Sequence, residues 1–453
     1  MARRGRCHRE RPIVRTRIPR THFNRADAGT NPTTPKPQAT GEDMLKPSLK
    51  TISIGLAIGM LAASCSSDSS EEPTTTQAQQ GATTTVGGQM EPIRVGTLLS
   101  VTGPLANLGD KMQQGMQLAV DQINDAGGID GRPIEWIMYD PAGDASTAID
   151  QTRRLITSDQ VDVIVGGGTS SGIALGMADI TEEAGIVFMA TEGARQIVSP
   201  IEDRQLTFKS TFNDTEIIER TIEFWQDRGI TRVAFLPDTT GFGTSALEVI
   251  EELAPPAGIE LFVESFDPST TDLTPQLSRL AANNPQTFFA WTATPAGVVF
   301  LKNASELGLQ DDALLQNGFG FVDSRYMVQA EDASVGSLLT AGKLPVYDQL
   351  PGGDAQKEAL TKFHDAFVDA FGEAPNVFAT QTYDGMMLVA EAIRRAGTTE
   401  GTAVAKALES ITDFVGLNGV YNFSADRHAG LQASDAVVFE WNGERFSLVW
   451  PSL

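Results

Sequence analysis

The stretch that decides the fold is RVGTLLSVTGPLANLGDKMQQGMQLAVDQINDAGGIDGRPIEW, residues 94–136. Ile93 and the first residues of this stretch, RVGTLLS, predict a strand over 93–100. Apolar residues then recur at helical spacing over 107–126, and Gly127-Gly128 marks the end of this helix. A second strand is predicted over 133–139. Strand, helix and strand in this order indicate a parallel sheet with a helix packed on it.

The same alternation continues in two series, with a break near 210–213. In the first series we predict helices at 146–158 and 171–184 and strands at 161–165 and 186–190. In the second we predict helices at 215–228, 244–253, 273–282 and 296–307, and strands at 232–236, 259–266, 287–291 and 313–316. Two series predict an α/β fold of two similar lobes. Helices at 354–371 and 380–396 return to the first lobe, and a hairpin over 436–450 turns at Asn442-Gly443.

Length and composition narrow the class of protein. A chain of 453 residues that is 41% hydrophobic suits two domains with sizeable cores. The net charge is −24, and 12 of the 34 Lys and Arg lie in the first 65 residues, so the remainder is strongly acidic. Such a surface repels phosphate backbones, and we expect no nucleic acid partner. Cys7 and Cys65 precede the folded part, and there are only four histidines, so we expect no disulfide, metal or cofactor in the body.

The segment 44–65 has the pattern of a secretory signal. Lys46 and Lys50 precede a mostly apolar run over 51–64, and small residues stand directly before Cys65. This ending resembles a bacterial lipobox, which implies export and lipidation of Cys65 at the outer face of the cell membrane. The alternative is ordinary cleavage, a bystander cysteine and a periplasmic protein. We predict that 1–43 is a non-native or disordered extension, with Met44 as initiator, and that 66–91 is a flexible linker.

From Ile93 onward the sequence resembles the periplasmic branched-chain amino acid (Leu/Ile/Val) binding proteins, which serve ABC transporters. The resemblance rests on residues that recur in that family at this spacing: Thr102-Gly103-Pro104, Gly109, Gly115, Ile123-Asn124, Gly127–Gly131, Val163–Gly167, Thr169–Ser171, Asp238–Gly243 and Tyr383–Gly385. It implies a type I periplasmic binding fold, with two Rossmann-like lobes that close on a ligand like a Venus flytrap.

The resemblance also implies how the chain divides. Three hinge crossings are expected near 209–213, 341–344 and 420–424. Lobe 1 would comprise 92–210 and 343–420, and lobe 2 would comprise 211–342 and 421–453. The implied function is an extracytoplasmic solute-binding protein of an ABC importer, monomeric, that captures a small amino-acid-like, carboxylate or amide ligand and presents it to permease subunits. A sensor subunit that serves a membrane receptor has the same fold and stays an alternative.

Two loops of the first lobe are candidates for the binding site, because ligands bind beyond the carboxyl ends of parallel strands. Residues 167–171 open a helix, whose N-terminal N–H groups and hydroxyls suit a carboxylate. The resemblance implies that Ser170 binds the ligand carboxylate, beside Thr169 and Ser171; the alternative is that the serines only cap the helix. The second loop holds Glu192, Gly193 and Ala194, and Ala194 replaces the family's carboxylate-binding threonine.

In the second lobe, Phe242 matches a tyrosine that faces the ligand, although packing at a helix start is an equal alternative. Thr294 and Phe319 lie in loops that align with ligand contacts. Tyr383 matches a cleft-facing tyrosine, with core packing as the alternative. The amino acid binders carry an acidic residue in the loop that here reads Asn317-Gly318-Phe319-Gly320.

Without that acid, a buried ammonium group lacks a partner. Glu192 would supply the charge, or else it is a solvated loop residue. We therefore expect a carboxylate or amide with an apolar body in preference to a plain α-amino acid.

One catalytic motif occurs. Residues 168–172 fit G-x-S-x-G, with Ser170 as nucleophile and His428 or His364 as base, which would make the protein an α/β-hydrolase. No HGGG-type oxyanion loop accompanies the motif, and short Gly/Ser turns match it by chance. No phosphate-binding G-x-x-x-x-G-K-[ST] motif occurs either. We therefore predict a binding protein without catalytic residues.

Overall fold

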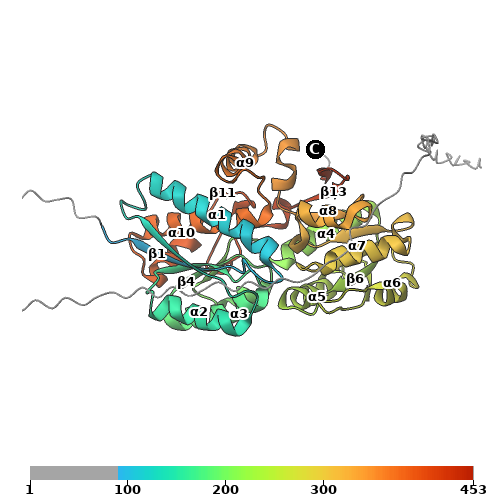
Figure 1. Ribbon diagram of the computed structural model, residues 1–453, viewed down its shortest axis with the longest axis horizontal. Helices are drawn as coiled ribbons and strands as arrows, with labels where there is room; N and C mark the ends of the chain where they lie inside the picture. The colour runs from blue at the N-terminus through green and yellow to red at the C-terminus, as the bar shows by residue number, and fades with distance from the viewer. Residues whose placement is uncertain (1–89, 452–453) are drawn as a thin grey trace, which may run out of the picture. The chain divides into compact units, whose positions relative to one another are not determined.

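A computed structural model describes residues 90–451. The predicted extension, the signal segment, Cys65 and most of the linker lie outside the described residues. The described part belongs to one compact unit, which contains two sheets, each with its own helices (Figure 1).

The first sheet is entirely parallel, in the order β2-β1-β3-β4-β5. Its strands are β1 (Ile93–Leu98), β2 (Ile134–Tyr139), β3 (Val163–Gly167), β4 (Val187–Ala190) and β5 (Thr207–Lys209). Figure 1 shows α1 (Ala106–Asp125) and α10 (Val377–Ala396) on one side of the sheet, and α2 (Ala145–Thr157) and α3 (Ser171–Ala184) on the other. Because helices cover both faces, β3 is buried at every residue. Two further helices, α9 (Lys357–Phe371) and α11 (Gly401–Glu409), pack on α1 and α10 respectively.

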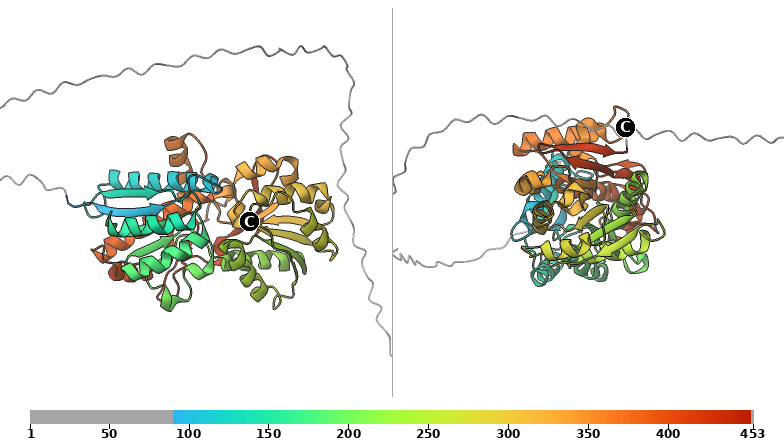
Figure 2. Two further views of the ribbon diagram at one scale, coloured as in Figure 1. Left: turned by 60° about the horizontal axis from the view of Figure 1, so that its bottom comes forward. Right: turned by 90° about the vertical axis from the view of Figure 1, so that its right-hand side faces the viewer.

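The second sheet has the order β14-β13-β10-β9-β8-β6-β7. Five of its strands are parallel: β6 (Arg232–Pro237), β7 (Glu260–Val263), β8 (Thr287–Trp291), β9 (Leu314–Asn317) and β10 (Leu338–Ala341). The hairpin of β13 (Val437–Trp441) and β14 (Phe446–Trp450) is antiparallel and extends the sheet beyond β10. The helices of this lobe are α4 (Asp214–Arg228), α5 (Gly241–Leu253), α6 (Thr274–Ala281), α7 (Ala296–Glu306) and α8 (Ser324–Ala330). Figure 2 shows the two lobes side by side.

The predicted fold class is therefore confirmed, but some elements differ. The analysis of the sequence missed β5, β10, α8 and α11, which have three to nine residues of weak periodicity. Helix α5 begins at Gly241, three residues before its predicted start, because Thr240 caps it there. The sequence did not reveal this start, since Gly241 and Gly243 carry no side chain that could show periodicity. This earlier start places Phe242 in the first turn of the helix.

The chain crosses between the lobes three times: after β5, after β10, and before β13. The third crossing lies later than the expected 420–424, because Ala429 still pairs with Lys209 at the end of β5. A short hairpin of β11 (Phe414–Val415) and β12 (Val420–Tyr421) precedes it.

A buried carboxylate joins the first crossing to the hairpin of β11 and β12. Asp384 on α10 accepts hydrogen bonds from the backbone N–H groups of Leu417 and Asn418, each at 2.9 Å. The Tyr421 hydroxyl lies 2.9 Å from Asp384 Oδ2 and 2.6 Å from the carbonyl oxygen of Ser210, in the first crossing. Burial raises the pKa of Asp384 to about 6, although these donors oppose the rise.

Candidate functional site

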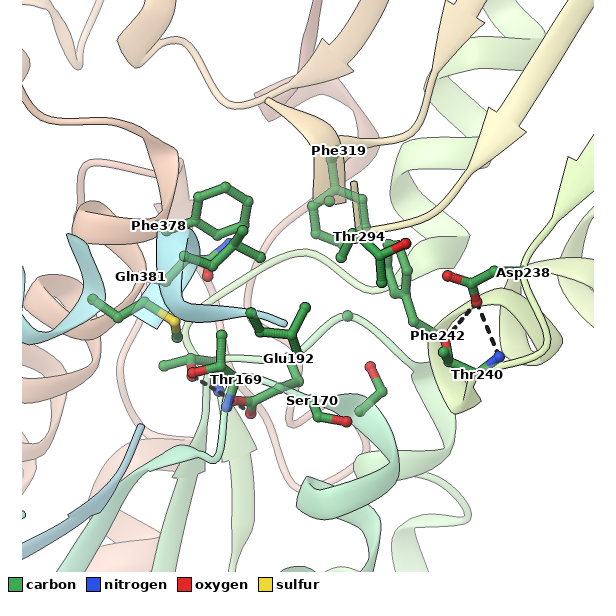
Figure 3. A pocket seen from close by; sticks show the side chains of 18 residues that line it. Thr169, Ser170, Glu192, Asp238, Thr240, Phe242, Thr294, Phe319, Phe378 and Gln381 are labelled. Carbon is green, nitrogen blue, oxygen red and sulfur yellow. Dashed lines mark hydrogen bonds between the residues drawn. The ribbon is translucent and has the colours of Figure 1, made fainter. Parts of the chain in front are cut away.

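A cleft between the lobes has an empty volume of about 580 Å³, open space at its mouth included. Loops at the carboxyl ends of strands from both sheets line it, as Figure 3 shows. Eight of the ten predicted binding residues line this cleft, Glu192 among them. The two that do not are Ala194 and Tyr383.

The first-lobe wall is built around the turn that follows β3. Gly168 and Thr169 both have positive φ, 73° and 63°. Thr169 is not a glycine, so this backbone conformation is unfavourable for it and needs support from neighbouring groups. Glu192 provides it: its Oε1 accepts hydrogen bonds from the N–H groups of Gly167 at 2.9 Å and Thr169 at 3.2 Å. The same carboxylate accepts the N–H and the hydroxyl of Thr191, each at 2.9 Å.

Glu192 is therefore buried, with 6% of its surface exposed, and the alternative of a solvated loop residue is wrong. Burial raises the pKa of the Glu192 carboxyl, while its four hydrogen bonds lower it.

Helix α3 begins at the same turn. Ser170 is its N-cap residue, but the Ser170 side chain makes no capping hydrogen bond. Ser170 lines the cleft (Figure 3), so the alternative in which it only caps the helix does not describe its side chain. The Ser171 hydroxyl instead accepts a hydrogen bond from the N–H of Ala194, at 3.3 Å. This bond ties the two first-lobe loops together.

The second-lobe wall is aromatic. Phe242 and Phe319 meet edge to face, with ring centroids 5.4 Å apart, and both pack on Trp291 beneath them. Both rings press on the first lobe at Gly193: a Cβ there would lie 2.6 Å from Phe319 and 2.8 Å from Phe242. Only glycine at this position permits the observed contact between the lobes.

Asp238 and Thr240 also line the second-lobe wall, and the analysis of the sequence did not propose them as binding residues. Asp238 directly follows β6; its Oδ1 accepts the N–H of Thr240 at 3.0 Å and its Oδ2 accepts the hydroxyl of Thr292 at 2.7 Å. Burial raises the pKa of Asp238, and these hydrogen bonds oppose the rise. Its place at a strand end was a signal in the sequence that pointed to the cleft.

Helices of the first lobe complete the cleft with mostly apolar side chains. These are Leu105, Leu108, Met112, Phe378 and Gln381. Sequence periodicity gives the buried face of α1 and α10, but not which buried residues reach the cleft, so these five were missed.

Two predicted residues lie elsewhere. Tyr383 does not reach the cleft: it contacts Phe363 on α9, and its hydroxyl donates to Gln122 on α1 at 2.6 Å. Gln381, two positions earlier on α10, lines the cleft instead, because residues two apart point to different sides of a helix. Ala194 is fully buried behind the wall.

Lys209 supports the loop of Gly193 and Ala194 from behind. Its buried ammonium group donates to the carbonyl oxygens of Gly193 at 2.9 Å and Ala194 at 3.2 Å, and to Asn213 Oδ1 at 2.6 Å. Burial lowers the pKa of Lys209 to about 8, against the opposing charges of Asp214 and Glu216.

Polar contacts join the lobes at two places outside the cleft. Arg325 on α8 pairs with Asp110 on α1, at 2.9 Å, and with Asp323, at 2.6 Å. The side-chain amide of Asn376, the N-cap residue of α10, also donates to Asp323, at 2.9 Å. On another edge, Arg195 pairs with Glu252 on α5 at 2.8 Å. The described lobes are therefore in their closed arrangement.

The catalytic alternative finds no base in the cleft. Among the described residues that line it, none is a histidine. His428 stacks on Phe208, with ring centroids 3.8 Å apart, and His364 stacks on Tyr347 at 4.7 Å. Ser170 therefore has neither of the bases that a hydrolase would need.

Two hinged α/β lobes that meet over a small cleft define the class of two-lobed solute-binding proteins. The family described as periplasmic binding protein matches residues 92–445, and this chain belongs to it. Its members are extracytoplasmic solute-binding proteins. None of the helices within residues 90–451 has the length and apolar character to span a membrane.

Known proteins of several bacteria are similar to this chain. The leucine-, isoleucine-, valine-, threonine-, and alanine-binding protein of Pseudomonas aeruginosa is 27% identical over 354 residues, which cover 78% of this chain and 90% of that protein. A Streptococcus pneumoniae branched-chain amino acid transporter substrate binding protein, solved with isoleucine, has a TM-score of 0.67 at 24% identity and covers 80% of this chain and 100% of its own. A Rhodopseudomonas palustris solute binding protein, solved with 3,4-dihydroxybenzoic acid, has a TM-score of 0.68 at 21% identity, with 79% and 96% covered.

Proposed function

We propose that this solute-binding protein captures a small molecule in the cleft between Thr169 and Phe319 and delivers it to the permease of an ABC importer. The observation that carries the proposal is that loops of both lobes line one cleft. A ligand held there contacts both lobes at once, so it favours the closed arrangement over the open one. The closed form is then the signal that the membrane partner reads.

The cleft supports binding without chemical conversion of the ligand. Its lining combines apolar and aromatic side chains with a few polar groups, which is the composition of a ligand site. The related proteins named above are described as binding proteins, and none of those descriptions gives a reaction. Ser170 is accordingly proposed as a binding residue, together with Thr169, Thr294 and Phe242.

Export and anchoring belong to the same proposal. A protein that supplies a permease from outside must cross the membrane, which the signal-like segment 44–65 supports. Lipidation of Cys65 would then hold the lobes near the permease through the linker. Mass spectrometry of the mature N-terminus tests this: a diacylglyceryl group on Cys65 supports it, and a free cysteine contradicts it.

A thermal-shift screen of the purified protein tests the capture function. Amino acids, amides, short carboxylates and aromatic acids are compared at 1,000 times their expected dissociation constants, where a ligand stabilises by about 4 kcal/mol. A saturable rise in melting temperature with one class of compound supports the proposal. No shift with any class contradicts it. If binding is found but deletion of the gene for this protein leaves uptake of the ligand unchanged, the sensor alternative is favoured.

A further inference from the structure

A histidine near the third crossing has one ring nitrogen without a hydrogen-bond partner. His428 lies between β12 and β13, and only 2% of its surface is exposed. Its Nδ1 lies 2.9 Å from the carbonyl oxygen of Arg204 and 3.0 Å from that of Thr207. Because carbonyl oxygens only accept hydrogen bonds, Nδ1 carries a proton and donates it. Nε2 is also buried, but no group among the described residues forms a hydrogen bond with it.

The atom nearest to this nitrogen across the gap is a carboxylate oxygen. Glu409 is the last residue of α11, and its Oε1 lies 3.4 Å from His428 Nε2. In a neutral imidazole with the proton on Nδ1, Nε2 is an acceptor. Two acceptors then face each other with no donor between them, which is unfavourable at a buried position. A cation between the two atoms, either a proton or a metal ion, removes this conflict.

The distance between the two atoms favours a metal ion over a proton. A charge-assisted N–H···O bond brings nitrogen and oxygen to about 2.7–2.9 Å. Zn²⁺ holds imidazole nitrogen and carboxylate oxygen at about 2.0–2.1 Å each, so two ligand atoms at a tetrahedral angle lie about 3.3–3.4 Å apart. The observed 3.4 Å between His428 Nε2 and Glu409 Oε1 matches the second arrangement.

The surroundings of the pair also suit a metal ligand. A histidine that binds a metal usually donates its other ring N–H to a carbonyl or carboxylate, which fixes the tautomer and the ring orientation. His428 does this toward Arg204 and Thr207. His428 and Glu409 line a surface hollow that gives an ion and water a way in. The other charged residues that line it are Glu182, Glu202, Asp203 and Lys406, so acids outnumber the lysine and attract cations.

We propose that His428 and Glu409 bind a divalent transition-metal ion of the zinc type through Nε2 and the carboxylate. Among the described residues, no group of three His, Cys, Asp or Glu side chains could hold a metal, so water must complete the coordination. Imidazole suits Zn²⁺, whereas Mg²⁺ and Ca²⁺ prefer oxygen ligands alone. The site lies outside the ligand cleft and is independent of the proposed capture function. It departs from the expectation, drawn from the small number of histidines, that the body holds no metal.

A metal at this position would strengthen the hinge. Glu409 belongs to α11, which packs on α10 of the first lobe, while His428 precedes the third crossing. The carbonyl oxygen of His428 accepts the N–H of Lys209 at 3.0 Å, and its ring stacks on Phe208. Both of these residues belong to β5, which leads into the first crossing. The ion would therefore fix the starts of two crossings to the first lobe, and we expect it to raise the melting temperature.

Calorimetric titration of the metal-free full chain at pH 7, with Zn²⁺ alone as the probe, tests the site. We expect saturable binding of Zn²⁺ and none of Mg²⁺. His428→Gln and Glu409→Gln are each expected to weaken Zn²⁺ binding at least about tenfold. Because Glu409 is partly exposed, its variant gives a result even if His428→Gln does not fold. His364→Gln is the matched control: this histidine also stacks on a ring and lies 3.1 Å from a carboxylate, that of Asp365, but Zn²⁺ binding should not change.

X-ray anomalous scattering at the zinc edge then locates the ion, and a peak between Nε2 of His428 and the Glu409 carboxylate supports the proposal. No binding of Zn²⁺ to the wild type would mean that a proton joins the pair, and the proposal would be wrong. Zn²⁺ binding that both variants retain at full strength would place the ion elsewhere and would also overturn it. Neither of these results affects ligand capture in the cleft.

Discussion

A single methyl group at Gly193 is expected to hold the lobes apart. Gly193 belongs to the first lobe, and a Cβ at this position would approach Phe319 to 2.6 Å and Phe242 to 2.8 Å, both in the second lobe. Such overpacking costs about 1–3 kcal/mol. The cost applies only when the lobes are closed, because the two rings leave Gly193 when they open. Gly193→Ala should therefore shift the closed-to-open ratio about 5- to 150-fold toward the open form.

Small-angle X-ray scattering measures this shift through the radius of gyration. We expect the variant to be more extended than the wild type at equal ligand concentration, and to need more ligand to become compact. Gly172→Ala is the matched control: it lies at the start of α3 near the cleft, and its added Cβ would meet only the Ser170 hydroxyl, at 3.9 Å. Equal scattering curves for Gly193→Ala and Gly172→Ala would refute the closed contact described here.

Three other substitutions test the supports of the cleft. Arg325→Ala removes the partly exposed ion pair with Asp110 that joins the lobes. We expect the free energy of ligand binding to weaken by about 1 kcal/mol, which is about fivefold in the affinity measured by calorimetry. An equal loss of affinity in Arg279→Ala, whose pair with Glu264 lies within one lobe, would argue against a role in closure. Lys209→Met leaves Asp214 and Glu216 without their buried cation and should lower the free energy of unfolding by about 3–5 kcal/mol in urea titrations. A loss no larger than that of Lys302→Met, at a partly exposed lysine, would contradict the stabilising role of Lys209. The pKa of Asp384 is raised from 3.8 to about 6 in the folded protein, so the folded state binds more protons than the unfolded state between these pH values. The contribution of this residue to stability therefore falls by about 2–3 kcal/mol as the pH rises through that window. Asp384→Asn should remove that part of the pH dependence, and parallel curves of stability against pH for variant and wild type would contradict it.

The sequence predicted the fold well because parallel α/β architecture repeats a simple pattern. Long helices such as α1 and α10 and buried strands such as β3 show their periods clearly. Short elements such as β5 owe their existence to pairing with β4 and to the bridge from Lys209 to Ala429, which no local pattern contains.

The candidate site was predicted unevenly for a related reason. Residues 169–171 and 192–193 closely follow the strands β3 and β4. They were predicted correctly because ligands bind beyond the carboxyl ends of parallel strands. Gln381 and Tyr383 share a helix in which most positions are buried, so only the packing of α1 and α9 decides which residue reaches the cleft. The role of Glu192 depends on a turn with positive φ at Thr169, which is formed by contacts 23 residues apart in the chain.

The most direct test is a crystal structure of the protein with the compound that gives the largest thermal shift. We predict electron density for that compound in contact with Thr169 or Ser170 on one lobe and with Phe242 or Phe319 on the other. Density on an outer surface of either lobe, with the cleft filled only by water, would contradict capture between the lobes.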